Sequence, residues 1–121
     1  MRYTRIYADE AGDTHFADAE FELAEAAYAP PAPPYLVSAS TPATGYAVTR
    51  IPAGWVGGWH PSPRLQLWFQ LSGDLEVEVS DGETRRFGPG SIVSVEDVSG
   101  KGHVTRVLGS EDVRAVYVHL A

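Results

Sequence analysis

Residues 54–73 read GWVGGWHPSPRLQLWFQLSG and carry more information about the fold than any other stretch of this chain. A glycine-rich turn leads to His60, and Ser62 and Gln66 follow at intervals of two and four residues. Side chains in a β-strand alternate between two faces, so Gln66 shares a face with Trp68 and Gln70. The stretch predicts a histidine-bearing loop followed by a strand with a polar and aromatic inner face.

A second informative stretch, residues 88–103, reads GPGSIVSVEDVSGKGH. Gly88-Pro89-Gly90 predicts a turn, and the apolar run 91–95 predicts a strand. A loop rich in glycine then leads to a second histidine, His103.

Together the two stretches resemble the paired signature motifs of the cupin superfamily. Motif one of that superfamily reads glycine, five residues, histidine, one residue, histidine, three or four residues, glutamate, six residues and glycine. Gly54, His60, Ser62, Gln66 and Gly73 fall on its five defined positions. Ser62 therefore stands where the second histidine ligand would be, and Gln66 where the carboxylate ligand would be.

Motif two of the cupins supplies a further histidine after a glycine-led turn and a strand. Counted from Gly90, His103 arrives two residues later than in the usual pattern, and Glu96 occupies the usual proline position. The resemblance covers residues 43–120, and the loop before His103 is longer and richer in glycine than the common form.

The resemblance implies an all-β fold, the cupin-type jelly-roll β-barrel also called a double-stranded β-helix. We expect one domain over residues 1–121, with N-terminal strands and a proline-rich strap in residues 1–42 and the barrel in residues 43–120. Small cupins are typically homodimers whose N-terminal strands add to the partner's sheet, so we expect a homodimer formed in this way.

The pattern of apolar residues also predicts an all-β sandwich or barrel. Leu75-Glu76-Val77-Glu78-Val79 alternates strictly, and residues 80–83 supply a turn from which residues 84–87 return as the second strand of a hairpin. The remaining clear strand signals are short apolar runs at residues 46–51, 65–71, 91–95, 104–108 and 113–120.

Residues 17–28 are ambiguous, because they contain strong helix formers and also alternate like a strand. The alternation favours a strand at Glu20 to Ala24. Pro30 to Pro34 then has to be extended, because proline fixes φ and donates no hydrogen bond. We expect this segment to lie as a rigid strap across the barrel surface.

Composition excludes several classes of protein. The chain of 121 residues has no cysteine, which excludes disulfides, thiolate metal sites and a cysteine nucleophile. Its net charge of −7 makes nucleic acid an improbable partner. No apolar run approaches the length of a membrane span and no secretory signal is evident, so we expect a cytoplasmic protein without a membrane partner.

The resemblance implies a small-molecule cavity inside the barrel. We expect His60, His103 and Gln66 to be the catalytic residues, and the same three to be the ligands of a metal if one is bound. The expected substrate-binding residues are Trp55, Trp59, Ser62, Trp68, Tyr46, Arg50 and Lys101.

Some of these positions have a second interpretation. Tyr46 and Arg50 share one strand face, and Arg50 is placed to bind a substrate carboxylate only if that face lines the cavity. The apolar neighbours of His60 favour its neutral imidazole. We expect His15 and His119 to be structural. We expect the Glu96-Asp97 pair to cap the turn at residues 99–102 rather than to do acid–base work.

Three hypotheses for function remain open. The first is a non-redox enzyme of the isomerase, dehydratase or cyclase type that acts on a carbonyl-containing metabolite without a metal. The second is a metal-dependent enzyme such as a dioxygenase, with one divalent Fe, Mn, Ni or Zn ion. The third is a binding module for a small molecule that has no catalytic activity.

Overall fold

The computed structural model describes all 121 residues, and it contains twelve β-strands and no helix. Accordingly, no helix is present that has the length and apolar character needed to cross a membrane. The strands are β1 (Arg2–Ala8), β2 (Thr14–Glu20), β3 (Ala24–Ala26), β4 (Tyr35–Val37), β5 (Ala43–Ile51), β6 (Val56–His60), β7 (Gln66–Ser72), β8 (Asp74–Val79), β9 (Thr84–Phe87), β10 (Ile92–Val95), β11 (His103–Leu108) and β12 (Val113–Leu120).

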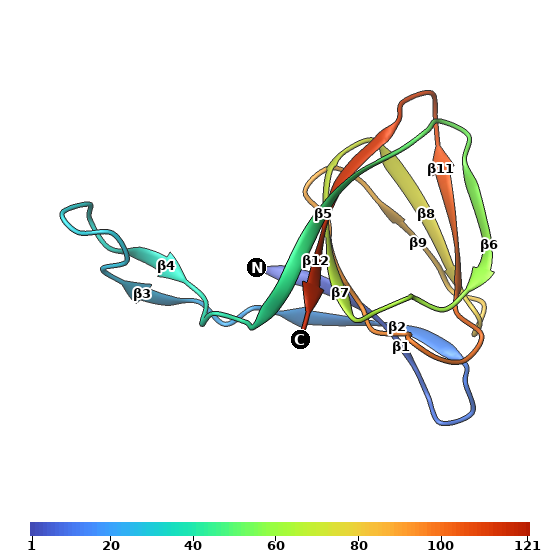
Figure 1. Ribbon diagram of the computed structural model, residues 1–121, viewed down its shortest axis with the longest axis horizontal. Helices are drawn as coiled ribbons and strands as arrows, with labels where there is room; N and C mark the ends of the chain where they lie inside the picture. Colours follow the sequence, from blue (N-terminus) through green and yellow to red (C-terminus); the bar gives the residue numbers. More distant parts are fainter.

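Ten of these strands form two sheets that curve around a common interior (Figure 1). One sheet has six strands in the order β2-β1-β10-β7-β12-β5, and the other has four in the order β6-β11-β8-β9. Every pairing is antiparallel except that of β1 with β10, where Thr4 lies opposite Val93. The predicted all-β jelly-roll barrel is confirmed.

The predicted hairpin is also present, as β8 and β9. Leu75, Val77 and Val79 are buried, while the glutamates between them face outward. Arg106 on the neighbouring β11 donates hydrogen bonds to both glutamates, at 3.4 Å to Glu76 and 3.0 Å to Glu78. The strict alternation of β8 therefore separates a core face from a face held by cross-strand charge pairs.

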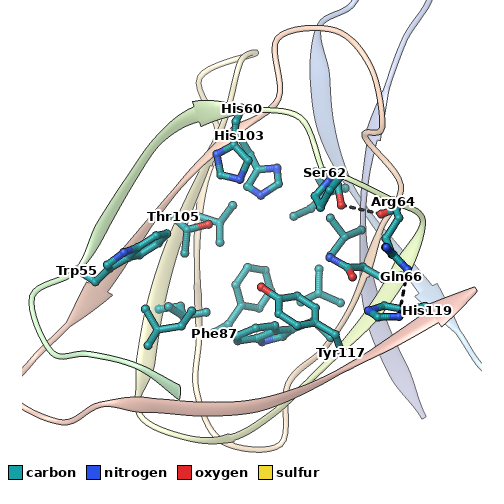
Figure 2. Close-up of a pocket in the computed structure, with 18 residues that line it drawn as sticks. Trp55, His60, Ser62, Arg64, Gln66, Phe87, His103, Thr105, Tyr117 and His119 are labelled. Atoms are coloured by element: carbon teal, nitrogen blue, oxygen red, sulfur yellow. Dashed lines mark hydrogen bonds between the residues drawn. The ribbon is translucent and has the colours of Figure 1, made fainter. Parts of the chain in front are cut away.

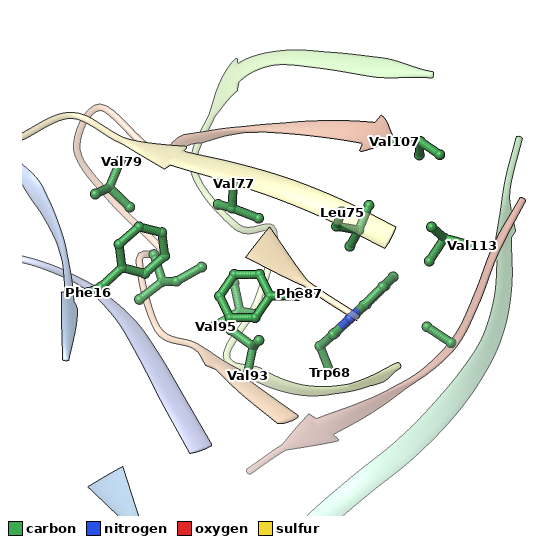
Figure 3. Close-up of a cluster of buried hydrophobic side chains, with 12 residues drawn as sticks. Phe16, Trp68, Leu75, Val77, Val79, Phe87, Val93, Val95, Val107 and Val113 are labelled. Atoms are coloured by element: carbon green, nitrogen blue, oxygen red, sulfur yellow. The ribbon is translucent and has the colours of Figure 1, made fainter. Parts of the chain in front are cut away.

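The core contains twelve buried apolar side chains contributed by both sheets (Figure 3). Ile6 from β1 and Phe16 from β2 belong to it, so the N-terminal hairpin completes the barrel of its own chain. The addition of N-terminal strands to a partner's sheet stays a prediction. Only the segment after β2 leaves the barrel.

Residues 21–42 form an arm that projects from the barrel and ends in a hairpin of β3 and β4 (Figure 1). The predicted strand at Glu20 to Ala24 was wrong, because β2 ends at Glu20 and β3 begins at Ala24. Phe21 instead stacks on Tyr3, with ring centroids 4.3 Å apart. The proline-rich segment lies at the tip of the arm and not across the barrel, so the predicted strap was wrong as well.

The outer face of the six-stranded sheet is apolar across four neighbouring strands. The strand register places Val48, Val116, Phe69 and Ile92 in one continuous row. Val48 is 73% exposed. A sheet with apolar side chains on both faces is typical of one that is covered on both.

Candidate functional site

A cavity of about 380 Å³ lies between the two sheets (Figure 2). Its wall is mostly apolar and aromatic, with polar groups along one side. The lining residues are Ile6, Ile51, Trp55, His60, Ser62, Pro63, Arg64, Gln66, Trp68, Leu75, Val77, Phe87, Val93, Val95, His103, Thr105, Tyr117 and His119. An apolar cavity with a few convergent polar groups is the usual form of a small-molecule site.

His60 and His103 lie together on the cavity wall. They are opposite each other in the β6–β11 register, and their ring centroids are 5.3 Å apart (Figure 2). His103 is buried, whereas His60 is exposed at the edge of the cavity. Trp59 and Pro61, the neighbours of His60 in sequence, are exposed too.

A buried carboxylate holds the His103 ring. Asp97 is completely buried, and its Oδ2 lies 2.6 Å from Nδ1 of His103. Nδ1 therefore carries the proton that it donates to Asp97, and Nε2 has a free lone pair. The expectation that Glu96 and Asp97 cap the following turn was wrong, since Glu96 accepts hydrogen bonds from Arg5 at 2.8 and 2.9 Å.

His60 is held in the same tautomer by a backbone group. Its Nδ1 lies 2.7 Å from the carbonyl oxygen of Gly58, so Nδ1 donates and Nε2 is again free. The two histidines thus present two basic nitrogens, one in a buried setting and one open to solvent.

The loop before His103 is clamped at its glycines. Gly102 has a φ of +75°, and a Cβ there would lie 2.1 Å from the backbone of His60. Its carbonyl accepts a 2.7 Å hydrogen bond from the hydroxyl of Thr14 in β2. The extra glycines of this loop therefore allow it to pass directly beside His60 and deliver His103 to the cavity.

The two residues at substituted motif positions both line the cavity but are held differently. The buried hydroxyl of Ser62 donates a 2.7 Å hydrogen bond to the carbonyl of Arg64 and so stabilises its own loop. Gln66 is also buried, but its amide points into the cavity (Figure 2).

No protein-family model matches the chain, and no curated protein matches it. Among solved structures, the cupin domain of Schizosaccharomyces pombe Cnp3 is similar to 89% of this chain and 72% of its own length, with a TM-score of 0.55 and 19% identity. This chain has the cupin fold. An identity of 19% shows a shared fold and not a shared activity.

Two further structures have TM-scores below 0.5 and support no argument. NMB1881 from Neisseria meningitidis has a TM-score of 0.45 and 20% identity, over 63% of this chain and 72% of its own. SPY1581 from Streptococcus pyogenes, described as a protein of unknown function, has a TM-score of 0.48 and 24% identity, over 69% of this chain and 71% of its own.

The cupin barrel brings three further polar residues to the cavity that sequence reasoning missed. Arg64 donates a hydrogen bond to Nδ1 of His119 at 3.3 Å, and the Tyr117 ring packs on Trp68 with centroids 4.9 Å apart. Burial raises the pKa of the Tyr117 hydroxyl. The alternation of β12 could have identified two of these residues in the sequence. Tyr117 and His119 share a strand face with Val113 and Ala115, which are fully buried.

The tryptophans of the cupin motif divide between the two sides of the wall. Trp55 and Trp68 line the cavity, whereas Trp59 is 50% exposed and lies outside it. The Trp55 ring covers Gly57, where a Cβ would lie 2.4 Å from the indole. Gly57 therefore makes room for the Trp55 ring.

Tyr46, Arg50 and Lys101 also lie outside the cavity. The face of β5 that carries Tyr46 and Arg50 points outward, and Ile51 lines the cavity instead. Arg50 pairs with Asp112 at 2.9 Å, and Lys101 pairs with Asp13 at 2.7 Å on the outer surface. Because the face of β5 that carries Arg50 does not line the cavity, Arg50 is a surface charge and not a ligand for a substrate carboxylate inside the barrel.

The donor set of this cupin site does not fit a metal centre with three or more strong protein ligands. No group of three or more His, Cys, Asp or Glu side chains is arranged to hold an ion. The Ser62 hydroxyl is bonded to a carbonyl, and Asp97 is bonded to His103. Two imidazoles and the neutral amide of Gln66 remain, and an amide is a weaker ligand than the carboxylate it replaces.

Proposed function

We propose that the protein is an enzyme that uses acid–base chemistry, without a metal, on a small carbonyl compound, in a reaction of the isomerase, dehydratase or cyclase type. The observation that supports it is the buried Asp97–His103 pair, whose free Nε2 lies on the wall of an apolar cavity. A carboxylate behind an imidazole fixes the tautomer and stabilises the imidazolium that forms when Nε2 takes a proton.

The proposed reaction begins with proton abstraction by His103. Its Nε2 takes a proton from the carbon next to the substrate carbonyl, and the electron pair of the broken C–H bond moves onto the carbonyl oxygen. The amide of Gln66 and the hydroxyl of Tyr117 donate hydrogen bonds to that oxygen. His60, exposed to solvent, exchanges protons with water and returns one to the product.

Exchange of substrate protons with D₂O, followed by NMR, tests this proposal on a panel of small ketones, aldehydes and oxo acids. His103→Gln is expected to slow exchange by about 10²–10⁴-fold, the usual contribution of a general base. The control is His15→Gln, which alters a histidine outside the cavity. Exchange that proceeds equally fast in His103→Gln would sink the proposal.

Asp97 acts here as a positioning residue, so its test needs a readout beyond activity. Asp97→Asn is expected to lower the rate of proton exchange and to displace the pH profile of that rate, because the amide can stabilise the wrong tautomer of His103. A lower rate with an unchanged pH profile would contradict this role.

Elemental analysis separates the proposal from its metal-dependent alternative. We expect no stoichiometric metal and no loss of proton exchange on treatment with chelator. Iron, manganese, nickel or zinc that is present at one equivalent, and absent from the His60→Ala/His103→Ala double variant, would instead support metal chemistry.

We also propose that two copies associate through the arm and the apolar outer face of the six-stranded sheet. The arm exposes Tyr28, Tyr35 and Leu36, and the sheet exposes Tyr46 and Val48. The arm contains two acidic residues, Glu22 and Glu25, and no lysine or arginine, whereas Arg114, which makes no ion pair within its chain, lies on that face of the sheet beside Arg50. The two surfaces are therefore complementary in charge as well as apolar.

Sedimentation measures the association. The wild type is expected to be a dimer and Val48→Asp a monomer. Val56→Asp, a matched change at an exposed valine of the other sheet, should leave the dimer intact. A monomeric wild type would contradict the proposal.

A further inference from the structure

The cavity wall contains basic side chains, whereas the chain as a whole is acidic. The protein has sixteen acidic residues and a net charge of −7. None of the eighteen lining residues is an aspartate or glutamate, while the wall includes one arginine and three histidines. The nearest carboxylate, that of Asp97, lies behind His103 and is bonded to it. The cavity wall thus carries no acidic side chain in a protein of net negative charge.

Arg64 is the cation of this wall, and it makes no ion pair. Five other basic residues do form ion pairs with an aspartate or glutamate: Arg5, Arg50, Arg85, Lys101 and Arg106. Arg64 instead donates one hydrogen bond to His119, which leaves most of its five N–H groups available. A guanidinium in this state is suited to bind a carboxylate through two parallel hydrogen bonds.

The neighbours of Arg64 are also hydrogen-bond donors. Because Nδ1 of His119 accepts from Arg64, the neutral ring carries its proton on Nε2. Burial raises the pKa of Tyr117, so its hydroxyl stays protonated and able to donate. Figure 2 shows Arg64, Gln66 and His119 gathered on one side of the cavity, with the Phe87 and Tyr117 rings beside them. The site combines a group of donors with an aromatic surface.

We propose that the ligand of this cavity is a small carboxylic acid, bound with its carboxylate at Arg64 and His119 and with an apolar body against Trp68, Phe87 and the Tyr117 ring. Arg64 is exposed and lies at the rim of the cavity, where its guanidinium can hold a charged group while the apolar body of the ligand lies deeper. A single arginine matches one negative charge, which favours a carboxylate over a doubly charged phosphate ester. Combined with the proposed function, on which this step rests, the substrate class is an oxo acid.

Calorimetric titration with matched acids and amides tests the binding step without turnover. The probes are benzoate, phenylacetate and hexanoate, each paired with its neutral amide. The wild type is expected to bind at least one acid about tenfold or more tightly than its amide, the range of a charge-assisted contact. Arg64→Gln should abolish that preference, and Arg64→Lys should restore part of it.

Two more variants complete the test. Arg86→Gln, which removes an exposed arginine on β9 outside the cavity, should leave the preference unchanged. His119→Phe should weaken binding of the acid more than binding of the amide, because it removes the second proposed donor to the carboxylate. Equal affinity for acid and amide, a preference that survives Arg64→Gln, or no binding of any acid at about 10 mM would each overturn the proposal.

The outcome separates this inference from the proposed function. Proton exchange on neutral ketones that is as fast as on oxo acids would preserve the acid–base enzyme and overturn the carboxylate site. Binding of an acid that depends on Arg64, without proton exchange on any compound, would preserve the carboxylate site and leave a binding module.

Discussion

The barrel and the arm both contain antiparallel strands, yet they differ in what their strands bury. Barrel strands such as β8 place every second side chain in a core shared by two sheets. The strands β3 and β4 have three residues each, pair only with each other, and leave Tyr35 and Leu36 exposed. An isolated two-stranded hairpin is at best marginally stable in water.

This difference shows that alternation alone does not stabilise a strand. Strands with alternating residues form a stable sheet when an opposing surface covers their apolar face. Within this chain, only the barrel provides such a covering surface. The stability of the molecule should therefore reside in the barrel, and substitutions should differ in effect according to the region in which they fall.

The largest contrast is expected between two aromatic truncations. Phe87→Ala removes a buried ring of the core and should lower the free energy of unfolding by about 3–5 kcal/mol. Tyr35→Ala in the arm should change it by less than about 1 kcal/mol at a protein concentration where the chain is monomeric. Urea denaturation, read at the midpoint with an unchanged slope, measures both. Similar losses of unfolding free energy for the two variants would contradict the view that the barrel, and not the arm, stabilises the molecule.

The next largest effect is expected at the glycines of the barrel loops. Gly102→Ala should destabilise by at least about 2 kcal/mol, since it combines a positive φ with a clash against the backbone of His60. Gly90 has a φ of +88° but open space around its Cα. Gly90→Ala should therefore lower the free energy of unfolding only by the strain of a positive φ, with no contribution from a clash. Equal losses in thermal unfolding would show that the close packing beside His60 is unimportant.

A smaller effect is expected from pH at the N-terminal hairpin. His15 bonds to Asp9 and Asp81, each at 2.8 Å, and these contacts raise its pKa. A group whose folded pKa is raised contributes stability below its unfolded pKa of about 6.5 and loses it as pH rises through the folded value.

The barrel should therefore become slightly less stable as the pH rises above about 6.5. His15→Asn should flatten that part of the profile of unfolding midpoint against pH. A midpoint that rises over this range in the wild type, or a decline that persists in the variant, would contradict the assignment.

The smallest effect is expected from removal of the arm. Residues 22–41 can be replaced by a Gly-Ser linker of ten residues, because β2 and β5 are five strand spacings of about 4.8 Å apart at most. At a protein concentration where the chain is monomeric, the free energy of unfolding should change by less than about 1 kcal/mol. A larger loss would show that the arm stabilises its own barrel.

Much of the barrel could be predicted from the sequence. The spacing around His60 identified the fold. The turn signals and the alternation of apolar and polar residues identified most strands, because a barrel strand with one buried face has an apolar residue at every second position. Alternation within residues 66–70 also predicted that Trp68 and Gln70 face inward, and both are buried. Gln70 donates 2.8 Å hydrogen bonds to the carbonyls of Gly73 and Phe87.

Other parts of the site could not be predicted in the same way. Both faces of β5 carry apolar residues, so its pattern does not show whether Tyr46 or Ile51 faces inward. The bond between Asp97 and His103 depends on how a glycine-rich loop folds back, which has no sequence period. The arm was misjudged because proline limits φ without determining where a segment lies.

The parallel pairing of β1 with β10 has a consequence for how the chain is made. Arg5 and Glu96, joined across this pairing, are 91 residues apart in sequence. At translation rates of about 5–20 residues per second, roughly 5 to 20 seconds separate the synthesis of the two strands. Through that interval the N-terminal hairpin lacks its neighbour β10 in the sheet. Closure of the barrel is therefore a late event in synthesis. The nascent protein should become resistant to proteolysis only after β10 has been made.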